Sequence, residues 1–213
     1  MPVKETTVEI KLKNLKTNLE YLKSKITSKT KFMAVVKAFS YGSDSRVVSQ
    51  ELERLGVDYL AVAYTQEGVD LRKFGIKIPI LVLHPQEKDF DNIIENQLEP
   101  SIYSFRILSF FFKTLKIKNK KSYPYHIKFN TGLNRLGFLK KDIHKLSELI
   151  KPNLPKYIFS HLGASEDLDE KEYTKKQIEE FISIDRDLEI KLKASLKKHL
   201  LNTSGILNYS NYQ

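Results

Sequence analysis

The sequence of 213 residues contains no cysteine, which excludes disulfide bonds and thiolate metal sites, and no metal site of another kind is expected. Its first residues, MPVKETTVEIKLKNL, lack the apolar segment of a signal peptide. No uninterrupted apolar stretch approaches the roughly 18 residues that a membrane-spanning helix needs. These absences predict a cytoplasmic protein that does not span a membrane.

The excess of positive charge, +10 at pH 7, raises the question of a nucleic-acid partner. Most lysines are dispersed along stretches such as KLKNLKTNLEYLKSK, where leucines recur at helical spacing, a pattern typical of a solvated helix face. The one dense cluster, KIKNKKSYP, has no interleaved aromatic side chains on which bases could stack. We therefore expect no nucleic-acid partner; such binding would have to be strongly salt-sensitive.

Strand-like apolar runs alternate with amphipathic segments of helical length along the whole chain. The helical segments include SDSRVVSQELERLG, which has a serine or aspartate cap and ends at Gly56, and TQEGVDLRKFG, which ends at Gly75. Strands are predicted at 32–36, 58–63, 78–83, 98–102, 123–129, 156–162 and 198–202. The alternation continues without a change of composition, so a single domain over residues 1–213 is expected.

Repeated strand–helix units of this spacing form a parallel sheet of the α/β class. Steady alternation without a glycine-rich dinucleotide turn favours a (β/α)8 barrel, the TIM-like fold, over a doubly wound sheet. Seven predicted strands leave such a barrel one strand short.

Chemistry in a (β/α)8 barrel collects at the C-terminal ends of the strands. Taken singly, the residues at these ends have ordinary explanations, because a strand-end histidine is usually hydrogen-bonded and NTG in FNTGLNRLG is common turn sequence. Their shared location makes them candidates for one site. They are Lys37, Leu83, His84, the segment 128–135, His161, Asn202 and Thr203.

Lys37 needs an explanation of its own, because it directly follows the apolar run FMAVV. Burying a lysine costs several kcal/mol unless the amine is paired or neutral. In an apolar barrel mouth, desolvation would destabilise the ammonium and make a neutral, nucleophilic amine accessible. Lys37 is therefore the first candidate for a catalytic group.

Five segments resemble those of alanine racemases, in order and over essentially the whole chain: MAVVKAFSYGSDS, VDYLAVAYTQEGVDLRKFGIKIPILVL, HIKFNTGLNRLGF, IFSHLGASED and HLLNTSGI. The likeness is greatest to the racemase module of bifunctional proteins that also carry a UDP-N-acetylmuramoyl-tripeptide:D-alanyl-D-alanine ligase, a Mur ligase. The resemblance implies a fold-type III barrel that uses pyridoxal 5'-phosphate. It further implies interconversion of L-alanine and D-alanine for peptidoglycan synthesis, and a homodimer in the full-length protein.

Carried over residue by residue, the resemblance makes Lys37 the lysine that carries the cofactor and the base on the D-alanine face of the substrate. Tyr41 would hold the cofactor phosphate through its hydroxyl, although it could also simply cap the barrel rim. Arg135 would bind the phenolic oxygen of the cofactor and help to place the substrate carboxylate, work that suits a rigid fork of donors.

The other implied site residues support these groups. Lys128 matches a lysine that is carbamylated in many members and orients the arginine, while His161 matches the histidine against the pyridine ring. Asn202 and Thr203 match an Asn-Ser pair whose second member binds phosphate, and threonine keeps the hydroxyl. The departure is Asn130, which stands where the family usually has aspartate and could loosen the loop.

The sequence ends at NYSNYQ, where the family continues into an eighth strand and a C-terminal β domain. By resemblance, the eighth strand supplies an arginine to the pyridine nitrogen, and the β domain supplies a tyrosine base for the L-alanine face of the partner's site. We therefore expect an incomplete barrel domain with little activity of its own. The alternative is a non-catalytic barrel that binds pyridoxal phosphate for its homeostasis; AFSYG after Lys37 and the Arg135 segment are unlike that family.

Overall fold

The computed structural model describes residues 7–213, which contain one parallel sheet of seven strands. The strands follow one another around the sheet in chain order, each hydrogen-bonded to the next. Their bounds are β1 Met33–Val35, β2 Tyr59–Val62, β3 Ile80–Val82, β4 Glu99–Ile102, β5 His126–Lys128, β6 Tyr157–Phe159 and β7 Lys197–His199. The seven predicted strands and the TIM-like class are confirmed; each observed strand is shorter than its apolar run.

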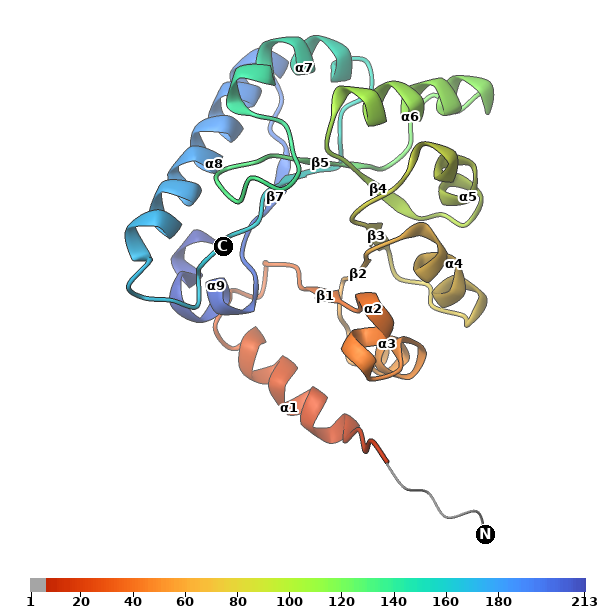
Figure 1. Ribbon diagram of the computed structural model, residues 1–213, viewed down its shortest axis with the longest axis vertical. Coiled ribbons are helices and arrows are strands. Elements are labelled where there is room, and N and C mark those ends of the chain that lie inside the picture. The colour runs from red at the N-terminus through yellow and green to blue at the C-terminus, as the bar shows by residue number, and fades with distance from the viewer. Residues whose placement is uncertain (1–6) are drawn as a thin grey trace.

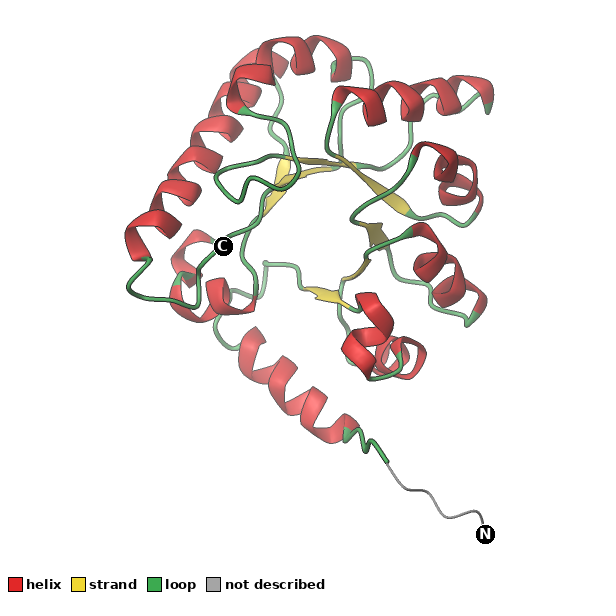
Figure 2. Cartoon of the chain, viewed as in Figure 1, coloured by secondary structure: helices red, strands yellow, loops and turns green. Residues whose placement is uncertain are grey.

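Helices cover the outside of this curved sheet, while the strands surround a common centre (Figures 1 and 2). The helices are α1 Leu12–Lys23, α2 Lys37–Gly42, α3 Ser45–Arg54, α4 Thr65–Lys73, α5 Phe90–Glu95, α6 Phe105–Ile117, α7 Ile143–Ile150, α8 Lys171–Leu192 and α9 Thr203–Asn208. No helix within residues 7–213 is both long enough and apolar enough to cross a membrane.

The helix boundaries follow from local chemistry. The Asp44 side chain caps α3 by accepting a hydrogen bond from the backbone N–H of Arg46, as the serine or aspartate at the start of this segment predicted. Gly56 and Gly75 end their segments with positive φ angles of 72° and 105°, a conformation that glycine adopts without steric cost. Both predicted helix ends are confirmed.

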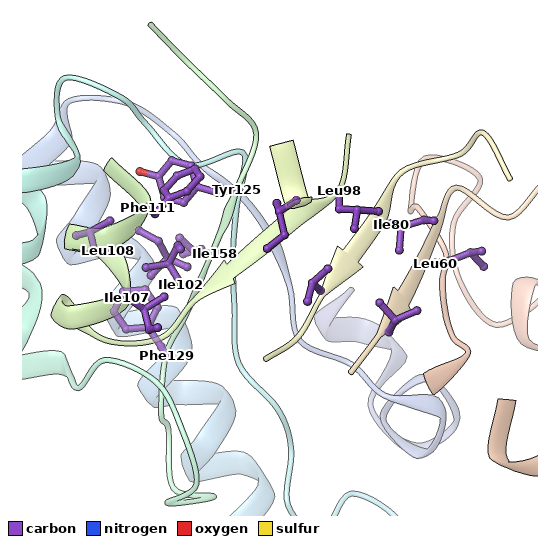
Figure 3. Packing of buried hydrophobic residues seen from close by; sticks show 14 of the residues in the cluster. Leu60, Ile80, Leu98, Ile102, Ile107, Leu108, Phe111, Tyr125, Phe129 and Ile158 are labelled. Carbon is purple, nitrogen blue, oxygen red and sulfur yellow. The ribbon is translucent and has the colours of Figure 1, made fainter. Parts of the chain in front are cut away.

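The two faces of the sheet differ in character. Alternate strand residues, such as Leu60, Ile80, Ile102 and Ile158, belong to one large apolar core that includes α6 side chains, among them Phe111. Figure 3 shows this packing between the strands and α6. The intervening strand residues face the centre of the barrel and include a polar set: Glu99, His126, Lys128 and His199. Burial of the apolar outer face stabilises the fold, and the polar side chains that could take part in a reaction lie on the inner face.

β1 and β7 are the two ends of the sheet and do not pair with each other among the described residues. β7 also ends earlier than predicted, at His199 instead of residue 202. Residue 202 belongs to the helix start instead: the side chain of Asn202 caps α9 by accepting a hydrogen bond from the N–H of Gly205 at 2.8 Å.

Candidate active site

Four of the predicted site residues come together at the C-terminal ends of β1, β5 and β6. Lys37 follows β1, Lys128 ends β5, Arg135 lies in the loop after β5, and His161 follows β6. The charges of Lys37 and Arg135 act on both Lys128 and His161 and shift their pKa values. The prediction that strand ends converge is therefore met for these four residues.

Lys128 is the most buried of these groups, with 6% of its surface exposed. Desolvation, together with the charges of Arg135 and Lys37, lowers the pKa of Lys128 to about 8. A sizeable fraction of this amine is therefore neutral near physiological pH and available as a nucleophile. Lys37 is half-buried: β1 ends at Val35, and Lys37 already belongs to the following turn.

His161 remains accessible to solvent in the mouth of the barrel. Desolvation by the barrel wall, followed by the charges of Lys128, Arg135 and Lys37, lowers the pKa of His161 to about 4, against a smaller opposing effect of Glu166. The imidazole is therefore neutral over the physiological range and can pack flat against an aromatic ligand without a net charge.

Lys37, Lys128 and Arg135 form no salt bridge with any carboxylate in the part of the chain that the structure describes. Three basic side chains gathered without an acidic partner repel one another, which costs stability. Such a cluster is balanced when it binds an anion, and phosphate and carboxylate groups match its donors. The site is therefore suited to a ligand with negative charge.

The backbone after Lys37 has an uncommon conformation. Four consecutive residues, Ala38 to Tyr41, have φ angles of +52° to +56°, so α2 is a left-handed turn. Left-handed helical geometry costs about 1–2 kcal/mol for each residue that has a Cβ atom. Strain of this kind is characteristic of functional sites, where the surrounding structure holds it in place.

The loop that carries Arg135 is closed by Asn130. Its side-chain oxygen accepts hydrogen bonds from the N–H groups of Gly132 and Asn134, and its NH2 group donates to the Asn134 side chain. The expected loosening of this loop is therefore absent, because Asn130 accepts the same two backbone hydrogen bonds that an aspartate would accept. Gly137 completes the loop: a Cβ atom there would lie 2.6 Å from backbone atoms of Phe129 and Asn130, so glycine is required.

Two residues were predicted to bind the cofactor phosphate, and Asn202 was predicted to lie beside them in the cofactor site. Tyr41 is 68% exposed, and Thr203 is exposed at the start of α9. The Asn202 oxygen is already occupied, since it accepts from Gly205 and from the Ser165 hydroxyl at 2.6 Å. Asn202 therefore shapes the turn that presents Thr203, and its oxygen is not free for a ligand. The Ser165 bond also ties this turn to the loop of His161.

Sequence reasoning missed Gln177, a buried residue of α8. Its oxygen accepts from the Gly163 N–H at 2.8 Å, and its NH2 group donates to the His161 carbonyl at 3.3 Å. The Gln177 side chain therefore fixes the backbone of the loop that contains His161. The sequence contained a weak signal, since a glutamine on the buried face of an amphipathic helix needs hydrogen-bond partners.

A second feature that the sequence analysis missed is a polar chain through the centre of the barrel. Glu99 accepts hydrogen bonds from the Lys156 ammonium at 2.6 Å and from His126 Nε2 at 2.9 Å. His126 Nδ1 lies 3.0 Å from Nε2 of His199, whose ring stacks on Phe159. The chain therefore extends from the N-terminal end of β6 to the C-terminal end of β7.

The charges in this chain can be assigned from its contacts. Burial alone would raise the pKa of Glu99, but the hydrogen bonds from His126 and Lys156 outweigh it and hold the pKa below its usual value. Burial lowers the pKa of His126 and, more strongly, that of His199. Glu99 is thus ionised and both imidazoles are neutral. His126 must then donate from Nε2 and accept at Nδ1 from the Nε2–H of His199.

These lowered histidine pKa values predict that stability falls on acidification. Below about pH 6.5 the unfolded chain binds protons at His126, His161 and His199 that the folded chain does not, so the free energy of unfolding decreases with decreasing pH. The slope approaches about 1.4 kcal/mol per pH unit for each histidine. Urea unfolding between pH 7 and pH 5 measures it. As a control, His144→Gln on the exposed surface of α7 should leave the slope unchanged. A flat profile over this range would contradict the neutral assignment.

A seven-stranded parallel sheet with a lysine after its first strand and basic side chains at its strand ends is the architecture of the α/β-barrel class, in which functional residues lie at the C-terminal face. The family model for the alanine racemase N-terminal domain matches residues 10–213. The chain therefore belongs to the family of alanine racemase N-terminal domains.

Individual relatives agree with this assignment. The chain is 32% identical over 211 residues to alanine racemase 1 of Caldanaerobacter subterraneus subsp. tengcongensis, covering 97% of this chain and 54% of that protein. It is 35% identical over 207 residues to the alanine racemase of Methanococcus maripaludis, covering 94% and 55%. The solved alanine racemase of Clostridium difficile 630 matches with a TM-score of 0.88 and 29% identity, covering 94% and 56%. The chain thus spans about half the length of these relatives.

Proposed function

We propose that this chain is the cofactor-binding barrel domain, over residues 1–213, of a pyridoxal phosphate-dependent alanine racemase. The observation that carries the proposal is the cluster of Lys37, Lys128 and Arg135, which has no carboxylate partner within residues 7–213 and lies next to a neutral His161. A phosphate and a substrate carboxylate are the negative groups that such a cluster would balance.

The residues present fit this cofactor. Lys37 provides the primary amine that an aldehyde requires, and the neutral ring of His161 can lie against a pyridine ring. The exposed hydroxyls of Tyr41 and Thr203 can donate to a phosphate. When bound, pyridoxal phosphate supplies an electron sink that makes the Cα hydrogen of an amino acid acidic enough to remove.

In the proposed reaction Lys37 removes and returns the proton on the D-alanine face of Cα, and Arg135 holds the substrate carboxylate. Lys128 positions Arg135. As a cation it repels Arg135, which contributes to its own lowered pKa. A neutral amine can react with carbon dioxide, and the resulting carbamate would be an anion that attracts Arg135 instead.

Several wider expectations are proposals that rest on family membership. They are a homodimer of the full-length protein, a role in peptidoglycan synthesis, and fusion to or association with a Mur ligase. Location in the cytoplasm likewise stays a prediction of the sequence.

A half-reaction tests the proposal. With a base on one face of Cα only, residues 1–213 plus pyridoxal phosphate in deuterium oxide should exchange the Cα hydrogen of D-alanine with retention of configuration. Exchange of L-alanine should be slower by about 10²–10⁴, the usual contribution of a general base. Mass spectrometry measures the exchange, and a chiral assay should find negligible racemisation.

Two controls decide the interpretation. Lys37→Ala should remove the exchange, and cofactor without protein gives the background rate. Covalent attachment of the cofactor without any exchange would favour the non-catalytic, cofactor-binding alternative. Equal exchange of both enantiomers would contradict the assignment of Lys37 to one face.

A further inference from the structure

The strained turn after Lys37 is bonded to a carboxylate from another element. Glu67, in the first turn of α4, accepts a hydrogen bond from the N–H of Ala38 at 2.7 Å through Oε1. Its second oxygen, Oε2, accepts from the N–H groups of Ala63 at 2.6 Å and Tyr64 at 3.0 Å. One side chain thus joins the residue directly after Lys37 to the end of β2, and Figure 1 shows α2, β2 and α4 as neighbours.

The chemistry of the acceptor matters here. A carboxylate has two acceptor oxygens and makes charge-assisted hydrogen bonds, which are shorter and stronger than neutral ones. The corresponding amide has one acceptor oxygen and would point its NH2 group at a backbone N–H. Four non-glycine residues in left-handed conformation tend to relax, so a strong bond at the first of them restrains the turn where it begins.

We propose that Glu67 is a positioning residue for Lys37: it holds the left-handed turn by its first N–H and so fixes the direction in which the Lys37 side chain points. The inference rests on the proposed function of Lys37 as the lysine that carries the cofactor. Glu67 itself touches neither cofactor nor substrate in this role.

The simpler explanation is that Glu67 only caps α4, with effects on stability alone. The chain offers a matched comparison in Glu53 of α3. Its Oε1 accepts from the N–H groups of Lys77 and Ile78 at 2.7 and 2.8 Å, ahead of β3 and therefore at the opposite end of the barrel from Lys37. Glu53→Gln removes the charge of this acceptor, keeps one oxygen for both N–H groups and does not alter the site, so it is the control for loss of charge alone.

The experiment compares Glu67→Gln and Glu53→Gln by incubation with pyridoxal phosphate, reduction with borohydride, and mass spectrometry of labelled peptides. In Glu67→Gln the labelling of Lys37 should fall by at least about tenfold relative to the wild-type chain, since hydrogen bonds to charged acceptors are worth this much or more. Glu53→Gln should keep the wild-type level of Lys37 labelling. Hydrogen exchange of the peptide that spans the turn should accelerate only in Glu67→Gln.

A rescue variant separates positioning from a general loss of structure. Glycine adopts positive φ as readily as negative φ, so Ala38→Gly lowers the cost of the turn. Adding Ala38→Gly to Glu67→Gln should restore part of the Lys37 labelling, which a helix cap acting only on α4 does not explain.

The outcomes are distinguishable. If Lys37 labelling survives Glu67→Gln, or falls equally in Glu53→Gln, the inference is wrong and the proposed function stands. If the wild-type chain is labelled on another lysine and never on Lys37, the proposed function of Lys37 fails and the inference fails with it.

Discussion

Lys37→Ala is expected to abolish covalent attachment of pyridoxal phosphate to this chain. The wild-type chain, incubated with the cofactor, should develop a visible absorption band, and borohydride should trap the cofactor on the peptide that contains Lys37. The physical reason is that attachment requires a primary amine, and Lys37 is the amine placed at the end of β1, beside Arg135 and His161. The effect should be all-or-none.

Lys128 is a competing nucleophile in this test. Its lowered pKa of about 8 means that a larger fraction of its amine is neutral near physiological pH than in an ordinary lysine. If nucleophilicity alone decided the reaction, Lys128 would be labelled. Lys128→Ala is therefore the matched variant, and it should keep the band and the label on Lys37. A label on Lys128, with Lys37 unmodified, would show that the two roles are reversed.

Periodicity and turn chemistry predicted the fold well. The seven strands, their order and the ends of α3 and α4 were visible because strand runs, caps and glycines act locally. The strand lengths were not, since an apolar run such as residues 123–129 continues past the three residues that pair as β5. Residue type alone cannot separate side chains that face helices from those that face the barrel centre.

The convergence of four candidate residues could be predicted, whereas their roles remain predictions. The sequence identified Lys37, Lys128, Arg135 and His161 as strand-end residues, and the structure brings them together. The strong desolvation of Lys128 and the left-handed turn after Lys37 were not predicted, because residue types such as Ala38 and Phe39 do not indicate either. The partners of Gln177 and Glu67 lie on other elements, so only tertiary structure reveals them.

The Glu99 chain was missed for a related reason. Glu99, His126 and His199 lie far apart in the sequence, and no pattern in the sequence links them. They meet because parallel strands place alternate residues on the inner face. A polar chain in the barrel centre is therefore a property of the register between strands.

Replacing Glu99 by leucine is expected to give the largest loss of stability of any change considered for this chain. Glu99 is 5% exposed and accepts from three donors: the Nε2–H of His126, the Lys156 ammonium and, at 3.4 Å, the Tyr59 hydroxyl. Glu99→Leu removes the acceptor for all three, and removing one member of a buried charged network costs about 3–5 kcal/mol. Because Lys156 is partly exposed and can turn toward water, we expect a value near the lower end.

Urea unfolding followed by circular dichroism measures this loss, and two controls bracket it. Glu99→Gln keeps the volume and one acceptor oxygen, so its cost should be about 1–3 kcal/mol. Glu172→Gln removes an exposed carboxylate that pairs with Lys175, and it should change the free energy of unfolding by less than about 1 kcal/mol. If Glu99→Leu were no more destabilising than Glu172→Gln, the central chain would contribute nothing to the barrel, and neutral histidines there would need a different explanation.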